Sequence, residues 1–351
     1  MSDRINNIKT YEGGKSFIPG KKNIIKLSSN ESPFGPSKKV LNAIDQASKK
    51  TNRYPTADCL ELKKNLGKKF RLPIKNIFCG NGSDEILGLL CQLFLSKNDE
   101  VIIPKHSFLM YEIYASINNA KIKYADVDDY SFKVDDIIKK ITKKTKIIFI
   151  AQPNNPTGMY LDKKSLNRLI KGVPKRIMIV IDAAYSEFIN NADYTDGLNL
   201  IRKNNNVIVT HTFSKIYGLA SLRLGWCAAS SRIIALLDKI RGPFNVNQIA
   251  QIAGSIALKD TNYEKKVIKH NKIWLKKFKL ELAKLPIKVY DSQANFVFVK
   301  VLDVNKLNKY LLSNGVIVRT LENYDIYDCM RISIGTESEN KKFLKLIKNY
   351  F

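Results

Sequence analysis

The stretch RIMIVIDAAY, residues 176–185, decides the fold that we expect for this chain. Its first six residues form a strand-like apolar run that an aspartate closes. Three similar runs lie at residues 146–151, 206–210 and 224–229, and helix-like segments such as Lys163 to Ile170 separate them. This alternation predicts an α/β fold around a mostly parallel sheet, in which ligands bind at the carboxyl ends of the strands.

The composition is that of an ordinary globular protein, with 44% hydrophobic and 26% charged residues. Its 351 residues exceed the usual limit of a single core, so we expect two domains. The N-terminus lacks the apolar core of a signal peptide, and no stretch approaches the roughly 18 apolar residues of a membrane span. We therefore expect a soluble, cytoplasmic protein whose five cysteines, which show no CxxC spacing, are reduced core thiols.

The formal net charge of +27 is the one feature that suggests a nucleic-acid partner. The lysines, however, are spread along the whole chain, without an interleaved stripe of arginine and aromatic residues or a nucleic-acid motif. We expect no such partner, only a modest attraction of anionic, phosphorylated ligands. The scattered His106, His211 and His270 lack ligand spacing and predict no metal site.

The order of the elements predicts a large domain followed by a smaller one. A short strand at residues 76–79 runs into an apolar helix at residues 84–95, whose free N–H groups point outward. After Pro243 the chain becomes a long lysine-rich helical stretch followed by three strand runs. The expected division is an N-terminal arm and small-domain segment over residues 1–30, a large domain over residues 31–243 and a small α+β domain over residues 244–351.

Four short motifs lie near the ends of the predicted strands: GNGSDE (80–85), PNNPTG (153–158), DAAY (182–185) and TFSK (212–215), with Arg223 following. Each alone is typical of ordinary turns and loops. In this order and spacing they closely resemble the pyridoxal-phosphate-dependent aminotransferases of fold type I. The resemblance implies pyridoxal 5'-phosphate as the cofactor.

The cofactor needs a lysine, an anion at its ring nitrogen and donors to its phenolate oxygen. The resemblance makes Lys215 the Schiff-base lysine and proton shuttle. Asp182 closes an apolar run, where a carboxylate is costly without a charged partner such as the protonated ring nitrogen. Asn155 and Tyr185 match the two phenolate donors, and Tyr111 is expected to stack on the ring.

The phosphate of the cofactor needs N–H donors and positive charge. Backbone N–H groups at Ser83 and Asp84, the Ser214 hydroxyl and the Arg223 guanidinium would supply them. We expect only backbone contact from Asp84, because its carboxylate would repel a phosphate. The Tyr54-Pro55 pair matches a family tyrosine that reaches the phosphate from a neighbouring subunit, which implies a homodimer with shared sites.

Five blocks narrow the resemblance to histidinol-phosphate aminotransferases: KLSSNESPFGP (26–36), RYP (53–55), FSKIYGLASLRLGW (213–226), RGPFNVNQIAQ (241–251) and MRISIGT (330–336). That family reversibly converts histidinol phosphate and 2-oxoglutarate to imidazole-acetol phosphate and glutamate, in histidine biosynthesis. One pocket must then bind both a phosphate and a carboxylate, which suits the planar fork of arginine.

Arg331 and Arg319 are the arginines that we assign to these anions, and Tyr11, Asn30 and Asn247 match family positions near the substrate. The chain also departs from the common family pattern at four positions: Thr10, Gly13, Ser32 and Ala183. None of these departures removes a chemical group assigned above, so the expected reaction type is unchanged. They bear on the path of the N-terminal arm and on the fine substrate preference.

Three other functions remain open at this point. Aromatic amino-acid aminotransferases share the catalytic set and take phenylalanine or tyrosine, so that activity, or both, would fit the sequence. Threonine-phosphate decarboxylase shares the fold and a phosphate-recognising arginine but releases CO₂. A basic nucleic-acid-binding protein would instead show steep salt-dependent binding to DNA and no cofactor absorbance.

Overall fold

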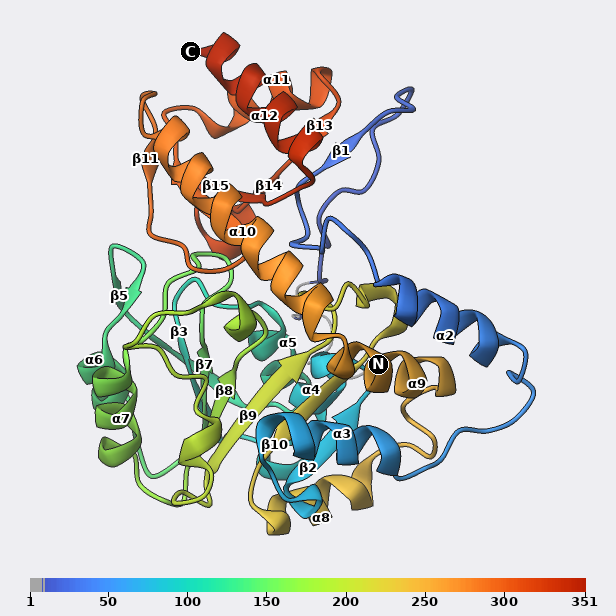
Figure 1. The fold of residues 1–351 in the computed structure, drawn as a ribbon. Helices are drawn as coiled ribbons and strands as arrows, with labels where there is room; N and C mark the ends of the chain where they lie inside the picture. The colour runs from blue at the N-terminus through green and yellow to red at the C-terminus, as the bar shows by residue number, and fades with distance from the viewer. Residues whose placement is uncertain (1–7, 9) are drawn as a thin grey trace.

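A seven-stranded sheet forms the centre of the larger part of the molecule (Figure 1). The computed structural model describes residues 8 and 10–351, so residues 1–7 and 9 of the predicted N-terminal arm lie outside the described residues. In spatial order the strands are β2 (Ile77–Gly80), β10 (Gly225–Ala228), β9 (Val207–Thr212), β8 (Met178–Asp182), β7 (Thr145–Ala151), β3 (Glu100–Pro104) and β4 (Lys121–Ala125). Only β10 is reversed, pairing antiparallel with both of its neighbours, so the predicted mostly parallel α/β sheet is confirmed.

Helices cover both faces of this sheet, which is why its strands read as near-continuous apolar runs. On β7, Ile147 and Phe149 pack into one apolar layer, whereas Ile148 and Ile150 pack into the other. The first layer contains α4 (Gly82–Phe94), α5 (Met110–Ile117) and α8 (Ser231–Ile240). The second contains α2 (Lys38–Ser48), α3 (Leu60–Phe70), α6 (Val134–Lys139), α7 (Lys163–Gly172) and α9 (Gln248–Lys259).

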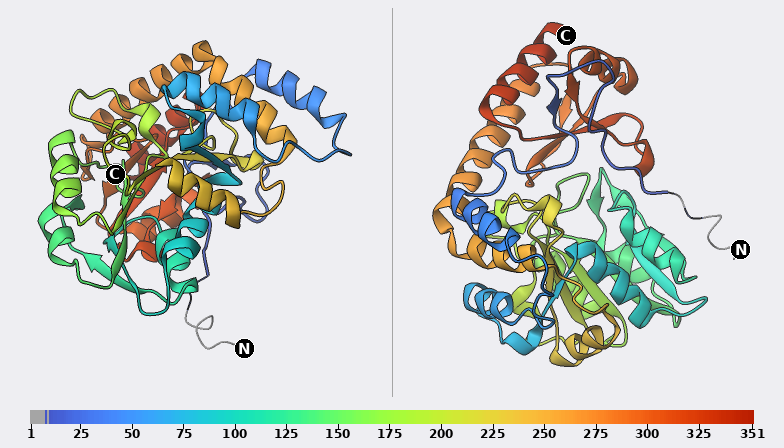
Figure 2. Two further views of the ribbon diagram at one scale, coloured as in Figure 1. Left: turned by 90° about the horizontal axis from the view of Figure 1, so that it is seen from below. Right: turned by 90° about the vertical axis from the view of Figure 1, so that its right-hand side faces the viewer.

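A four-stranded antiparallel sheet forms the smaller part, which lies at one end of the larger one (Figure 2). Its strands are, in order, β11 (Lys288–Val289), β12 (Phe296–Lys300), β15 (Cys329–Ser333) and β14 (Arg319–Thr320). Its helices are α10 (Thr261–Leu282), α11 (Val304–Ser313) and α12 (Glu337–Tyr350). Two short pairs complete the strands: β1 (Ile25–Lys26) with β13 (Val316–Ile317), and β5 (Val127–Asp128) with β6 (Ser131–Phe132).

The boundary between the two parts lies later in the chain than residue 243. α9 follows that residue, yet its Ala250 and Ala253 belong to the core around the seven-stranded sheet. α10 crosses between the parts, because its Val267 joins that core and its Phe278 joins the core of the small sheet. We therefore propose that the small domain comprises the segment up to residue 30 and the chain from within α10 onward.

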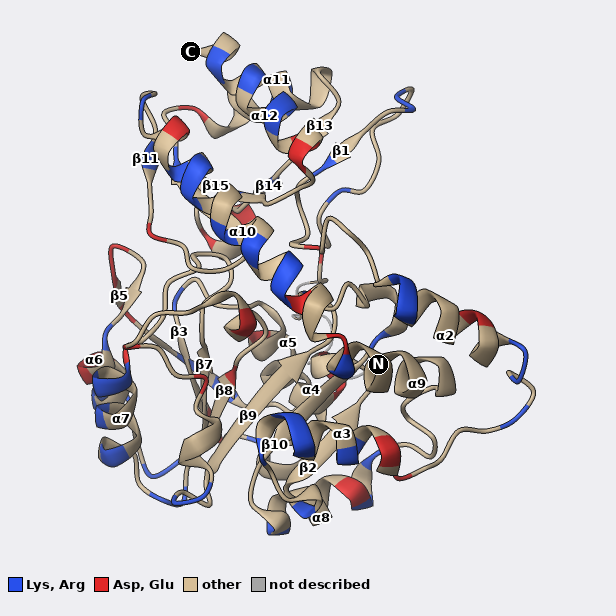
Figure 3. Cartoon of the chain, in the orientation of Figure 1, with Lys and Arg blue, Asp and Glu red and all other residues tan. Residues whose placement is uncertain are grey.

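Lys and Arg lie on helices of both parts, including α2, α7, α10 and α12 (Figure 3). All five cysteines are buried and free. None of the helices in the described part of the chain has the length and apolar character that a membrane crossing needs. Within the same residues, no cluster of three or more His, Cys, Asp or Glu side chains is arranged to hold a metal ion.

Candidate active site

A cavity of about 240 Å³ lies at the carboxyl ends of β7, β8 and β9, where the fold predicts a ligand. Side chains from both parts of the molecule line it. They include all of the sequence-predicted site residues except Tyr54 and Asn247: Tyr11, Asn30, Ser83, Asp84, Tyr111, Asn155, Asp182, Tyr185, Ser214, Lys215, Arg223, Arg319 and Arg331. Segments separated by hundreds of residues therefore meet at one place.

Lys215 projects into this cavity from the loop that follows β9. Its Nζ donates to the Ser29 carbonyl oxygen at 3.2 Å and lies 5.6 Å from the centre of the Tyr185 ring. Burial, followed by the positive charge of Arg331, lowers the pKa of Lys215 to about 8. The amine is therefore neutral far more often at neutral pH than an exposed lysine, as a nucleophile requires.

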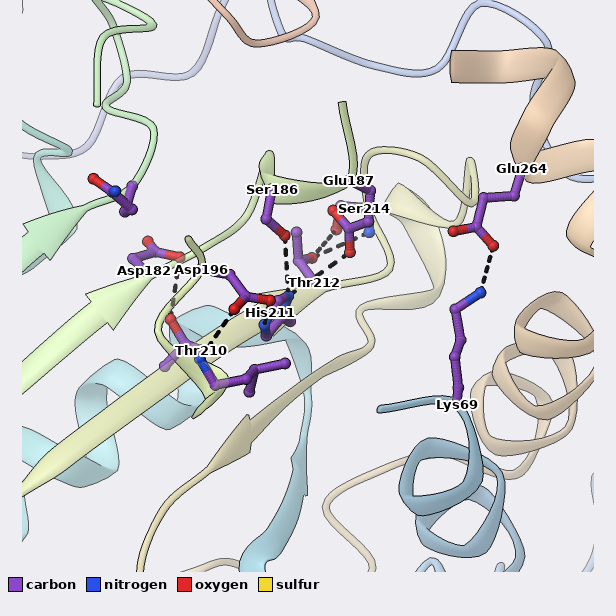
Figure 4. A network of polar contacts seen from close by, with 12 residues as sticks. Lys69, Asp182, Ser186, Glu187, Asp196, Thr210, His211, Thr212, Ser214 and Glu264 are labelled. Atoms are coloured by element: carbon purple, nitrogen blue, oxygen red, sulfur yellow. Dashed lines mark hydrogen bonds and ion pairs between the residues drawn. The ribbon is translucent and has the colours of Figure 1, made fainter. Parts of the chain in front are cut away.

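Asp182 is a buried carboxylate at the end of β8 that is held by neutral hydroxyl groups. The Tyr111 hydroxyl donates to Oδ2 at 2.8 Å. The Thr210 hydroxyl donates to Oδ1 at 3.1 Å (Figure 4). Burial raises the pKa of Asp182, and these two hydrogen bonds oppose the rise. No basic side chain within residues 8 and 10–351 forms a salt bridge with it, so the carboxylate has room for a cationic ligand group.

Side chains alternate along β9, and this alternation places Thr210 beside Asp182 and Thr212 beside Ser214 (Figure 4). Thr210 binds Asp182, and the Thr212 hydroxyl donates to the Ser214 oxygen at 2.9 Å. His211, between them, stacks on Trp226 with a ring-centre distance of 4.5 Å. The two threonines thus face the site, and His211 is part of the packing beside it.

The packing of Tyr111 does not favour the stacking role that we expected from the sequence. Its ring is fully buried and stacks on Phe149, with a ring-centre distance of 4.7 Å. Its hydroxyl instead holds Asp182. Phe108, three residues earlier, also lines the cavity and is only partly buried. We propose Phe108 as the ring that stacks on the cofactor.

At the phosphate end of the cavity, Arg223 lies close to the N-terminus of α4. Its Nη2 donates to Asp84 Oδ2 at 2.9 Å and its Nη1 to the Ala220 carbonyl oxygen at 3.0 Å. The Asp84 side chain thus pairs with Arg223, and a contact of Asp84 with the phosphate through its backbone N–H stays a prediction. Gly225 permits this arrangement, since a Cβ there would lie 2.3 Å from the Ser83 backbone nitrogen.

Among the described residues, the two arginines assigned to substrate anions bind neutral acceptors only. Arg331 lies on the inner strand β15, and its guanidinium donates to the Ser28 carbonyl oxygen at 2.7 Å and to Asn155 Oδ1. Its buried Nε has no partner. Arg319 donates to the carbonyl oxygens of Glu12 and Gly13, each at 2.8 Å. Both charges are therefore available to an anion.

Two predicted residues lie away from the cavity. Tyr54 is 82% exposed and stacks on Phe244 with a ring-centre distance of 4.6 Å. Asn247 caps α9, accepting from the Ala250 N–H at 2.8 Å. Asn247 is thus a helix cap in this chain, and Tyr54 is an exposed residue on the surface.

Residues 22–347 match the family of class I and II aminotransferases. The chain belongs to this family. A histidinol-phosphate aminotransferase from Pelagibacter ubique (strain HTCC1062) is 43% identical over 349 residues, covering 98% of this chain and 97% of the relative. The solved histidinol-phosphate aminotransferase from Clostridium acetobutylicum is 28% identical, with a TM-score of 0.87 over 93% of this chain and 99% of that one. The solved enzyme from Sinorhizobium meliloti, in complex with pyridoxal 5'-phosphate, is 22% identical with a TM-score of 0.88, covers 100% of this chain and 98% of that one, and shows the fold alone.

Enzymes of this family depend on pyridoxal phosphate, and the cavity fits that cofactor. When bound, the cofactor supplies a cationic ring that accepts the electrons of the substrate carbanion. The buried Asp182 carboxylate, which has no salt bridge within the described ranges, suits the protonated ring nitrogen. Arg223, Ser214 and the start of α4 would hold the phosphate, Asn155 and Tyr185 would donate to the phenolate oxygen, and Lys215 would move the proton at the substrate Cα.

Proposed function

We propose that the chain transfers an amino group reversibly between L-histidinol phosphate and 2-oxoglutarate, forming imidazole-acetol phosphate and glutamate in histidine biosynthesis. The observation that carries this proposal is the pair of arginines, Arg331 and Arg319, that reach the cavity without carboxylate partners among the described residues. Both substrates bring an anion to the same pocket. Relatives of this name that match almost end to end support the choice of substrate.

The visible absorbance spectrum of the purified protein tests the proposal. Bound pyridoxal phosphate should give a yellow band that histidinol phosphate bleaches and 2-oxoglutarate restores in the same cuvette. Both half-reactions would then be established. The absence of a band after addition of pyridoxal phosphate would overturn the proposal, because the reaction needs the bound cofactor.

Aromatic amino-acid transamination is the second candidate, because the rings of Tyr11, Phe108 and Tyr324 line the cavity. Such rings accept a phenyl group as readily as an imidazole. The same cuvette separates the two activities. Bleaching by phenylalanine or tyrosine alone would keep the cofactor chemistry and move the substrate to the aromatic class, whereas bleaching by both would show dual activity.

Arg331→Lys is expected to weaken the binding of both substrates together and to raise the KM of each roughly tenfold. Lysine keeps the charge but loses the fork that holds two oxygens at once. Steady-state kinetics with histidinol phosphate and 2-oxoglutarate varied separately measures the effect. Arg176→Lys is the matched control, since Arg176, like Arg331, donates to two neutral oxygens but lies away from the cavity. A rise in only one KM would refute a shared anion site.

We also propose that the enzyme works as a cytoplasmic homodimer. An 82% exposed tyrosine stacked on Phe244 is an unusual surface feature, and Tyr54 matches the family position that reaches a neighbouring site. In that arrangement Tyr54 of one subunit would donate to the cofactor phosphate of the other. Each site would then need two chains.

A further inference from the structure

Ser333 is a buried serine at the end of β15 that does not line the cavity but is joined to it by hydrogen bonds. Its hydroxyl oxygen accepts from the Asn30 backbone N–H at 2.8 Å. The same hydroxyl donates to Asn30 Oδ1 at 3.0 Å. A serine hydroxyl has one hydrogen, so accepting from the backbone leaves that hydrogen free for the side-chain oxygen.

This pair of bonds decides which way the Asn30 amide faces. With Oδ1 turned toward Ser333, Nδ2 points at Tyr185 and donates to its hydroxyl oxygen at 3.0 Å. The Asn30 backbone is fixed as well, because its carbonyl oxygen accepts from Asn295 Nδ2 at 3.0 Å. Asn30 is buried at a φ of 54°, a conformation that asparagine tolerates better than most residues.

The orientation of the Asn30 amide determines to which acceptor the Tyr185 hydroxyl can donate its hydrogen bond. Because the Tyr185 oxygen accepts from Asn30, its own hydrogen is free for an acceptor in the cavity. If the amide were turned over, Oδ1 would face Tyr185 and accept that hydrogen instead. Tyr185 would then no longer donate into the cavity.

We propose that Ser333 is a positioning residue that, through Asn30, aims the Tyr185 hydroxyl at the phenolate oxygen of the bound cofactor. The contact joins three separate segments: the small-domain strand β15, the segment before α2 and the loop after β8. The inference rests on the cofactor and on Tyr185 as its donor, not on which substrate the enzyme takes. Its readout therefore needs no turnover.

The test is a pH titration of the visible absorbance band of the holoenzyme without substrate. A phenolate that loses a donor is less stable, so the midpoint of the titration should rise in Ser333→Ala, by roughly one pH unit. Ser333→Thr keeps the hydroxyl and should stay near the wild-type midpoint. Ser292→Ala is the matched control, because it removes another buried hydroxyl, one that donates to the Phe296 carbonyl oxygen, without touching Asn30.

A double substitution shows whether the effect passes through Tyr185. In a Tyr185→Phe background, Ser333→Ala should no longer move the midpoint. A shift of equal size in that background, or an unshifted midpoint in Ser333→Ala itself, would overturn the inference. If Ser333→Ala does not fold, Asn30→Asp serves instead, since both of its oxygens accept, and its upward shift should be larger with Tyr185 present than with Phe.

The result is separable from the proposed function. A wild-type protein without any cofactor band would overturn the proposed function and this inference with it. A wild-type band that titrates normally, together with a Ser333→Ala band that titrates identically, would overturn the inference alone.

Discussion

Lys215→Ala is expected to abolish transamination, lowering kcat by about 10⁴-fold or more, while the protein stays folded. Alanine has no amine to bind the carbonyl carbon of the cofactor or to move the proton at the substrate Cα. Stability should not fall. Burial lowers the pKa of Lys215 to about 8, so at neutral pH the folded state carries a disfavoured ammonium that alanine removes. Turnover of histidinol phosphate and thermal unfolding followed by circular dichroism measure the two effects.

The control for this variant is Lys272→Ala, which removes an exposed lysine from α10. Near-wild-type turnover by Lys215→Ala would exclude this lysine from the chemistry.

The same variant also tests the homodimer. Mixed with Tyr54→Ala subunits, it should regain activity, because each hybrid dimer contains one site with both an intact Lys215 and an intact Tyr54. No recovery after verified subunit exchange would place Tyr54 outside the neighbouring site.

Asp182→Asn should give the second largest loss, roughly 10²- to 10³-fold in kcat. Asparagine preserves the shape of the side chain but carries no charge, so it cannot keep the ring nitrogen of the cofactor protonated. The cofactor band should persist, since Lys215 is untouched. Stopped-flow measurement of the half-reaction with histidinol phosphate would report the slower proton removal directly.

Asp196→Asn is the matched control for Asp182→Asn. Its carboxylate lies 3.9 Å from His211 Nε2, in the packing beside β9, and does not line the cavity. Its loss should leave kcat within about twofold, as for most substitutions away from reacting atoms. Equal losses in the two variants would mean that a general acidic environment, not a carboxylate at the ring nitrogen, supports the reaction.

The apolar runs predicted the α/β sheet, and all but two of the residues assigned from the motifs line the cavity, because buried strands and turns leave local marks in a sequence. The direction of a strand leaves no such local mark in the sequence. The run at residues 224–229 has the same character as its parallel neighbours, yet β10 runs the other way, and only its pairing with β2 and β9 shows this. α9 likewise reads as the start of a second domain although its alanines pack on the first.

Other features of the site depend on tertiary packing. Phe108 precedes α5 and Tyr111 lies in its first turn, and only the packing of Tyr111 on Phe149 distinguishes the two rings. Asp84 pairs with Arg223, which is 139 residues away. Ser333 and Asn30 are separated by 303 residues, so no local pattern could have linked them.

The residues assigned to the cofactor and those assigned to the substrate anions come from different sources. The former lie at the edge of the large sheet, whereas Arg319 and Arg331 stand on β14 and β15 of the small one. Substitutions on β14 and β15 therefore act first on the substrate anions, which marks the small sheet as the place to begin a redesign of specificity. Ser333 would be kept in such a redesign, because its hydrogen bonds reach Tyr185 through Asn30.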